Sequence, residues 1–293
     1  MSAQPTQTTP LLRIQDLSVS YPTPDGLKEV VRGVDLSVSR GERVALVGES
    51  GSGKSVTARA VLRLDPEART SGRILLDGED VLEMSAREVR RVRGARAGLV
   101  FQDPLASLNP VKTVGWQITQ PLRIRGVGRR EARRRAVDLL GRLGVADAAR
   151  RFDDYPHQFS GGMRQRVVIA IAVIAEPQVL VADEPTTALD VRVQAQVLGL
   201  LGELARERDM AVLLITHDLG IVAGFAQRVA VMRDGGLVEE GDVDGVYTSP
   251  RHPYTRALLD AVPRIGDQPG RRLGTATDPA AAPVAVSTEG GQL

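Results

Sequence analysis

The chain has 293 residues, of which 42% are hydrophobic and 25% charged, so it can form one large hydrophobic core or two medium ones. The absence of cysteine excludes disulfides, thiolate metal sites, iron–sulfur clusters and a cysteine nucleophile, and the three histidines are too scattered for a zinc site. No apolar run approaches the roughly 18 residues of a transmembrane helix, and the first residues lack the layout of a signal peptide. We therefore expect a protein of the cytosolic side. The net charge of +2 gives little support to a nucleic-acid partner, and none is expected.

The N-terminal third has mainly the pattern of β-strands. Residues Leu12–Tyr21 nearly alternate between apolar and polar, Pro22–Gly26 has the composition of a turn, and Val30–Val38 continues as a second strand. Shorter strand signals follow at Arg73–Leu76 and Ala97–Gln102. This part of the chain is therefore expected to form a largely β unit.

The remaining chain alternates between helical and strand patterns. Apolar residues between positions 103 and 165 recur at helical steps, which predicts a helical insertion. The elements expected after it are a helix at Val167–Ala175, a strand at Val179–Ala182, a helix at Val191–Arg208, a strand at Ala211–Thr216, and a hairpin of Val229–Arg233 with Leu237–Glu240. Such alternation predicts a parallel sheet with flanking helices, an α/β fold. Residues 1–10 are expected to be a flexible lead-in and residues 263–293 a disordered tail.

A phosphate-binding pattern stands between the apolar run Arg43–Val47 and the helix-compatible stretch Val56–Leu64. Residues Gly48–Ser55 match G-x-x-x-x-G-K-[ST], in which glycines let backbone N–H groups surround an anion at the start of a helix. Lys54 can reach the β- and γ-phosphates, and Ser55 can ligate Mg²⁺. The alternative is an accidental match of a Gly/Ser-rich loop. The residues expected to bind nucleotide here are Gly48, Ser50, Gly51, Ser52, Gly53, Lys54, Ser55 and Val56.

Two further features carry chemistry. The buried strand ending at Asp183 and Glu184 places Asp183 where it can hold Mg²⁺ through a water, and Glu184 where it can polarise an attacking water. Upstream, Ser160, Gly161 and Gly162 begin a helix and can offer a hydroxyl, N–H groups and the helix dipole to a second anion. The alternative for this second feature is a capped helix after a turn.

With these motifs, the chain resembles the nucleotide-binding subunit of an ATP-binding cassette (ABC) transporter. The matching elements, in chain order, are the loop Gly48–Ser55, Gln102, Ser160–Gly162, Asp183–Glu184, Ala188–Asp190 and His217. The resemblance implies a P-loop NTPase fold with a RecA-like parallel core sheet, an antiparallel β subdomain and an inserted helical subdomain. The implied nucleotide-binding domain covers residues 11–262, with the helical subdomain at about 103–165.

The resemblance also implies roles for single residues. Tyr21 would stack on adenine, although a solvent-facing strand tyrosine is the alternative reading. Gln102 would contact Mg²⁺ and the lytic water and couple to the membrane partner, His217 would contact the γ-phosphate, and Asp190 would cross a dimer interface. Met163 departs from the Gln found in many family members. The implied cofactors are ATP and Mg²⁺.

In this family two nucleotide domains enclose ATP between them, so Ser160–Gly162 of one chain would complete the Lys54 site of another. The implied partners are a second ATPase subunit, either an identical chain or a paralogue, two transmembrane permease subunits and, indirectly, a solute-binding protein. The implied location is the cytoplasmic face of the cell membrane, as a peripheral subunit.

The amino-acid sequences of four segments resemble those of the ATPases of dipeptide/oligopeptide importers, a group that includes nickel and glutathione importers. These segments are Phe101–Pro110, Tyr155–Ser160, Asp183–Val191 and His252–Thr255. Many relatives carry a cysteine-bearing iron–sulfur region after the last segment, which a chain without cysteine cannot have. In physical terms His252-Pro253 is expected to start a helix that runs over Tyr254–Ala261.

Two other classes of function remain open at this stage. One is a soluble ABC-type ATPase of DNA repair or translation, which usually has a long coiled-coil insertion or two cassettes. The other is a regulatory binder that does not hydrolyse nucleotide, although Lys54, Glu184 and His217 are all present. The arginine-rich stretch Arg123–Arg135 is either a solvated helix face or a docking surface for membrane subunits or anionic lipid.

Overall fold

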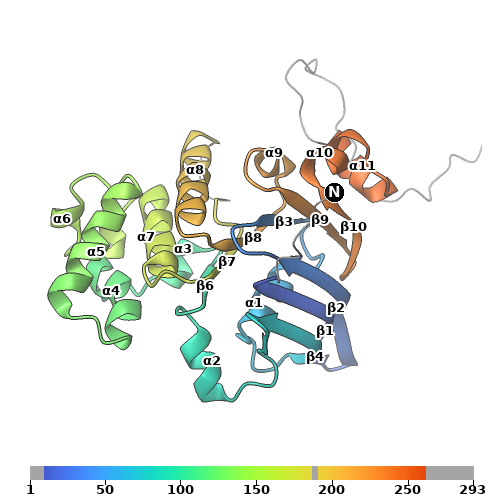
Figure 1. Cartoon of the computed structure of the whole chain (residues 1–293), viewed down its shortest axis with the longest axis horizontal. Helices are drawn as coiled ribbons and strands as arrows, with labels where there is room; N and C mark the ends of the chain where they lie inside the picture. The colour runs from blue at the N-terminus through green and yellow to red at the C-terminus, as the bar shows by residue number, and fades with distance from the viewer. Residues whose placement is uncertain (1–9, 187–190, 262–293) are drawn as a thin grey trace, which may run out of the picture.

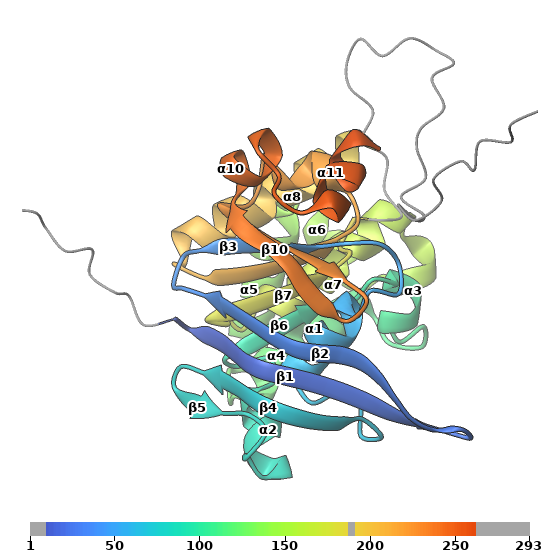
Figure 2. The same ribbon diagram turned by 90° about the vertical axis from the view of Figure 1, so that its right-hand side faces the viewer.

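The computed structural model describes residues 10–186 and 191–261, in which two sheets lie one above the other (Figures 1 and 2). The smaller sheet is antiparallel, with strand order β2-β1-β4-β5, and the larger has strand order β10-β9-β3-β8-β7-β6. In the larger sheet every neighbouring pair is parallel except β10 with β9. The strands are β1 (Leu12–Thr23), β2 (Gly26–Val38), β3 (Arg43–Val47), β4 (Arg69–Leu76), β5 (Glu79–Asp80), β6 (Ala97–Val100), β7 (Val179–Asp183), β8 (Ala211–Thr216), β9 (Arg228–Arg233) and β10 (Gly236–Asp242).

The helices form three groups around the sheets. Figure 1 shows α4 to α7 gathered on one side, α1 next to the antiparallel sheet, and α10 and α11 at the outer strand β10. The helices are α1 (Lys54–Val61), α2 (Ala86–Val92), α3 (Pro104–Ser107), α4 (Val114–Ile124), α5 (Arg129–Arg142), α6 (Ala148–Arg151), the 3₁₀ turn η1 (Pro156–Gln158), α7 (Gly161–Val173), α8 (Val191–Glu207), α9 (Leu219–Val222), α10 (Val243–Thr248) and α11 (Pro253–Asp260).

The central strands β7 and β8 are apolar up to their last residues because both faces of the large sheet are covered. In β7, Val181 packs into the core between the two sheets, whereas Leu180 packs into the core formed with the helices. Strand β8 alternates in the same way, with Leu213 in the first core and Val212 in the second. Successive strand side chains point to opposite faces, so a strand buried on both sides has no polar face.

This architecture confirms the predicted α/β fold, with a parallel core sheet, an antiparallel β unit and helices α3 to α6 placed within the expected insertion. Helix α1 ends at Val61, three residues before the predicted Leu64, and Arg63 shortly after it has a left-handed φ of 48°. Strand β6 ends at Val100, so Gln102 lies beyond the strand and does not end it. Strand β1 continues through Thr23, which shortens the predicted turn.

Helix α2 was not predicted, although a signal for it is present. Ser85 caps its first turn by accepting from the N–H of Glu88, and the Glu88 carboxylate accepts from the N–H of Ser85. This reciprocal capping box is a sequence signature of a helix start.

Some expectations concern parts of the chain outside the structure's description. Residues 1–9, 187–190 and 262–293 are not described, so the expectations for both ends of the chain and for Asp190 stay predictions. Over the residues that are described, no helix has both the length and the apolar character that crossing a membrane requires.

Gly98 on β6 tests how closely α7 packs on the sheet. A Cβ placed on Gly98 would lie 2.5 Å from the backbone oxygen of Ala172, so Gly98→Ala must push helix and sheet apart. We expect a loss of about 1–3 kcal/mol in the free energy of unfolding, measured by urea denaturation. The matched control is Gly199→Ala in α8, where a Cβ meets no atom within 4 Å and should stabilise the helix by up to about 1 kcal/mol. Equal stability of both variants would contradict the close approach.

Candidate functional site

The phosphate loop joins the carboxyl end of β3 to α1, and its glycines are required by geometry. Gly48 has a φ of 154°, and a Cβ there would lie 2.2 Å from the backbone oxygen of Met232. Gly53 has a φ of 105°, and a Cβ there would lie 2.9 Å from the backbone oxygen of Val30. The loop therefore packs closely against β2 and β9, and these contacts leave no room for a side chain at Gly48 or Gly53.

The Lys54 side chain turns back into this loop and is almost fully buried. Its Nζ donates to the backbone oxygens of Gly48 at 2.8 Å and Glu49 at 2.7 Å, and lies 3.3 Å from Ser52 Oγ. Burial lowers the pKa of Lys54, and the negative charges of Glu184, Asp183 and Glu49 partly oppose that shift. The ammonium is thus held inside the loop where a bound phosphate would need a cation.

Ser55 and Asp183 meet directly beside the loop. Ser55 Oγ donates to Asp183 Oδ1 at 2.9 Å, across 128 positions of the chain. Burial raises the pKa of Asp183, the hydrogen bond from Ser55 lowers it, and the charge of Glu184 raises it again. A hydroxyl and a carboxylate oxygen are the hard ligands that Mg²⁺ accepts together with phosphate oxygens and water, so this pair fits the predicted magnesium site.

Glu184 is held between two of the other predicted residues. Its Oε2 accepts from Gln102 Nε2 at 2.8 Å, and its Oε1 lies 3.1 Å from His217 Nδ1. The Glu184 side chain is 12% exposed, whereas His217 is 54% exposed. Gln102, which follows β6, and His217, which follows β8, therefore converge on the carboxylate of Glu184, which follows β7.

The backbone at Glu184 is unusual for a residue with a side chain. Its φ is 45°, in the left-handed region that non-glycine residues rarely adopt, and its N–H donates to the backbone oxygen of Ile215 at 2.9 Å. The chain thus turns sharply after Asp183, which directs the two successive carboxylates to different neighbours, Ser55 and Gln102.

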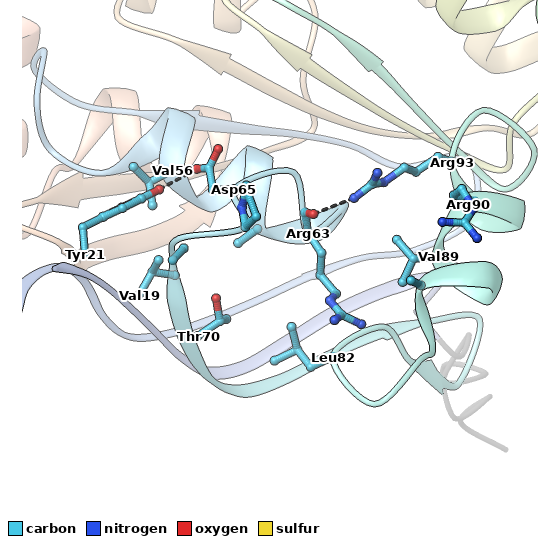
Figure 3. Close-up of a pocket in the computed structure, with 14 residues that line it drawn as sticks. Val19, Tyr21, Val56, Arg63, Asp65, Thr70, Leu82, Val89, Arg90 and Arg93 are labelled. Carbon is cyan, nitrogen blue, oxygen red and sulfur yellow. Dashed lines mark hydrogen bonds between the residues drawn. The ribbon is translucent and has the colours of Figure 1, made fainter.

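Tyr21 lies on the wall of a cavity of about 500 Å³ between α1, α2 and the antiparallel sheet (Figure 3). Its hydroxyl donates to Asp65 Oδ2, and the same oxygen accepts from Arg59 Nε at 2.9 Å. Burial and the neighbouring Asp65 carboxylate raise the pKa of Tyr21. Val56 lines the same cavity. The half-buried, hydrogen-bonded position argues against a merely solvent-facing tyrosine, while stacking on adenine stays a prediction.

Ser160 does not join the other residues. It precedes α7, its side chain makes no capping hydrogen bond, and Ser160 and Gly161 are exposed. Figure 1 places α7 with α4 to α6, on the other side of the molecule from β1, β2 and β4. A capping role for the Ser160 side chain therefore finds no support in the structure, and the exposed start of α7 is accessible to a ligand or partner.

In the arginine-rich stretch, the three arginines at its C-terminal end are paired with acids. Arg134 and Arg135 both donate to the Glu131 carboxylate, and these hydrogen bonds lower the pKa of Glu131 to about 2. Arg133 forms an ion pair with Asp153 at 2.9 Å. These pairs favour the solvated helix face over a docking surface.

Two contacts to the phosphate loop were not foreseen from the sequence. The N–H of Glu49 donates to the Tyr254 hydroxyl at 3.0 Å, and the N–H of Gly235 donates to the Ser52 backbone oxygen at 3.1 Å. Both partners come from the C-terminal part of the described chain. The segment His252–Thr255 had been singled out for its resemblance to the importer ATPases and, in physical terms, as a helix start. The structure confirms the helix start, because Pro253 begins α11 and His252 caps it.

Comparisons with known proteins agree with this geometry. Residues 31–187 match the family model described as ABC transporter, and residues 238–287 match the one described as oligopeptide/dipeptide transporter, C-terminal region. The oligopeptide transport ATP-binding protein OppD of Bacillus subtilis (strain 168) is 48% identical over 263 residues, which cover 88% of this chain and 74% of OppD. The dipeptide transport ATP-binding protein DppD of the same organism is 48% identical over 259 residues, 87% of this chain and 77% of DppD.

A solved structure is similar over most of the fold. It is the dimeric structure of a post-hydrolysis state of the ATP-binding cassette MJ0796 bound to ADP and Pi, with a TM-score of 0.72 and 29% identity, covering 79% of this chain and 98% of that chain. The resemblance noted in the sequence is therefore confirmed. This chain belongs to the ABC transporter family, in the branch that carries the oligopeptide/dipeptide transporter C-terminal region.

Proposed function

We propose that this chain is the ATP-hydrolysing subunit of a membrane importer that takes up peptides or a related small solute. The observation that carries the proposal is the convergence of Gln102 and His217 on Glu184, next to the Ser55–Asp183 pair and the Lys54 loop. The names of OppD and DppD support the solute class, and the direction of transport is inferred from the resemblance to importer ATPases. Relatives of this kind give no support to a role in DNA repair or translation.

Glu184 is the proposed general base. Its carboxylate can accept a proton from a water whose oxygen attacks the γ-phosphorus of ATP, so that ADP leaves with the electrons of the broken P–O bond. The contacts from Gln102 and His217 hold both carboxylate oxygens in place before substrate arrives, which reduces the cost of orientation. His217, which is largely exposed, can turn towards the terminal phosphate.

The loop residues bind and orient the triphosphate. The Lys54 ammonium has three N–H donors, and its longest contact, to Ser52 Oγ at 3.3 Å, is the one most easily exchanged for a phosphate oxygen. Ser55 and Asp183 would hold Mg²⁺, with Gln102 close by, and the metal would neutralise charge on the phosphates. Tyr21 and Val56 would contact the adenosine part of the nucleotide.

A complete site is proposed to need two protomers. Ser160, Gly161 and Gly162 stand at the start of α7, where Ser160 and Gly161 are exposed, and Figure 1 shows α7 on the other side of the molecule from β1 and β2. This arrangement supports a role for them at the nucleotide of another subunit. Asp190 is assigned to the same interface by the resemblance alone. The dimeric state printed for MJ0796 supports the arrangement.

The shared site predicts recovery of activity on mixing two inactive variants. Lys54→Met removes the loop cation, and Ser160→Arg blocks the second half of the site. In a mixed dimer one site combines the intact Lys54 of one chain with the intact Ser160 of the other. We therefore expect phosphate release that is near background for each variant alone and reaches a measurable fraction of wild type after mixing. Activity of the mixture no higher than the sum of the separate variants would refute a shared site between identical chains.

The membrane partners are proposed to be two transmembrane permease subunits, which this chain would bind at the cytoplasmic face of the membrane, and which a solute-binding protein would serve. The second ATPase subunit would be an identical chain or a paralogue. Reconstitution with the permease pair in vesicles tests this assignment, since ATPase activity should rise sharply on adding permease and again on adding loaded binding protein. Activity unaffected by either addition would count against transport coupling.

A further inference from the structure

The C-terminal helix α11 reaches back to the phosphate loop through one buried side chain. Tyr254 is 4% exposed, and its hydroxyl accepts the Glu49 N–H at 3.0 Å, although the two residues are 205 positions apart. Tyr254 also lies in the segment, residues 238–287, that matches the oligopeptide/dipeptide transporter C-terminal region. The contact therefore connects that segment with the triphosphate site.

One peptide group is held from both ends by this contact. The N–H of Glu49 and the C=O of Gly48 belong to the same planar peptide unit. Its N–H donates to Tyr254, and its C=O accepts from Lys54 Nζ at 2.8 Å. The C=O of this peptide group positions the Lys54 ammonium, and the hydrogen bond to the Tyr254 hydroxyl opposes rotation of the group.

Tyr254 is itself firmly placed. The guanidinium of Arg233, at the end of β9, lies over its ring at 5.0 Å from the centroid. His252 Nδ1 accepts from the Tyr254 N–H at 3.2 Å. Glu239 on β10 accepts from the N–H groups of Arg251 at 2.7 Å and His252 at 3.0 Å, which anchors the start of α11 to the large sheet.

We propose that Tyr254 is a positioning residue for ATP binding, which holds the Gly48–Glu49 peptide so that Lys54 and the loop amides are preorganised for the triphosphate. The inference rests on the proposed function. Ordering a flexible loop on binding costs free energy and lowers the affinity, and a loop that is already ordered avoids this cost. Tyr254 touches no substrate atom and acts only through the loop.

The test is Tyr254→Phe, which removes the hydroxyl and keeps the ring under Arg233. We expect the ATP dissociation constant and KM to rise about three- to tenfold, the effect of one neutral hydrogen bond, with kcat close to wild type. Tyr247→Phe is the matched control, because its hydroxyl donates to the backbone oxygen of Leu219 and not to the phosphate loop. It should cost similar thermal stability but leave ATP binding unchanged.

A second variant checks the anchor. Glu239→Ala frees the start of α11, so it should weaken ATP binding in the same direction. Combined with Tyr254→Phe it should add little further loss, because both act on one contact. Losses of ATP affinity that add in the double variant would contradict the claim that both residues act through the same contact.

The outcomes separate the inference from the function on which it rests. Wild-type ATP affinity in Tyr254→Phe, or equal weakening in Tyr247→Phe, overturns the positioning role while leaving the proposed ATPase intact. A wild-type chain that does not bind Mg-ATP overturns the proposed function and this inference with it.

Discussion

Glu184→Gln is expected to lower kcat for ATP hydrolysis by about 10²- to 10⁴-fold, the range typical for loss of a general base. Glutamine keeps the shape of the side chain and an oxygen that can still accept from Gln102, but it cannot take a proton from water. ATP binding should therefore persist, because the loop and the Ser55–Asp183 pair are unchanged. Phosphate release by the purified chain at saturating ATP measures the effect.

The trapped nucleotide gives this prediction a second readout. In the proposed two-protomer mechanism the protomers separate after hydrolysis, so Glu184→Gln should accumulate as an ATP-bound dimer in size-exclusion chromatography. The control is Glu176→Gln, whose carboxylate is 61% exposed and lies 3.9 Å from Arg208, and which should behave as wild type. Phosphate release by Glu184→Gln at near the normal rate would remove Glu184 from the role of base.

Lys54→Met is expected to weaken ATP binding by about tenfold to 150-fold, equivalent to the roughly 1.5–3 kcal/mol of a hydrogen bond from a charged donor. Methionine keeps an unbranched apolar stem as far as the Cε position but leaves the phosphates without their buried cation. Isothermal titration with Mg-ATP measures the affinity directly. We expect hydrolysis to fall further than binding, because charge on the phosphates is greatest in the transition state.

The matched control for this substitution is Lys112→Met, which removes the same charge at an exposed lysine before α4, where the ammonium lies 5.3 Å from the centroid of the Trp116 ring. It should bind ATP as wild type does. Equal affinities for Lys54→Met and wild type would show that the loop does not grip the triphosphate through this residue.

The phosphate loop and the catalytic strand ends could be predicted because their signals are local. The strand Arg43–Val47, the loop and the helix start stand within one short stretch, and Asp183 with Glu184 ends an unbroken apolar strand. In a parallel sheet such strand ends lie along one edge. This geometry brings together Gln102, Glu184 and His217, which are widely separated in the sequence.

The contacts across long stretches of chain could not be predicted in this way. Nothing near Glu49 indicates that its N–H will find Tyr254, because that pairing depends on how β10 and α11 return to the sheet. The bond between Tyr21 and Asp65 has the same origin. The early end of α1 depends on the left-handed backbone of Arg63, a conformation that the residue type does not suggest. Tertiary packing decided these details.

Glu184 has to meet two requirements, a left-handed backbone conformation and the chemistry of the proposed general base. A left-handed φ of 45° costs a residue with a side chain of order 1–3 kcal/mol, and among non-glycine residues asparagine and aspartate tolerate it best. Replacement by a β-branched residue would therefore damage the fold as well as the chemistry, whereas asparagine or glycine would spare the fold. Subunits of this architecture that lose hydrolysis through such tolerated exchanges would survive as intact nucleotide holders, so inactive copies can persist within an asymmetric pair.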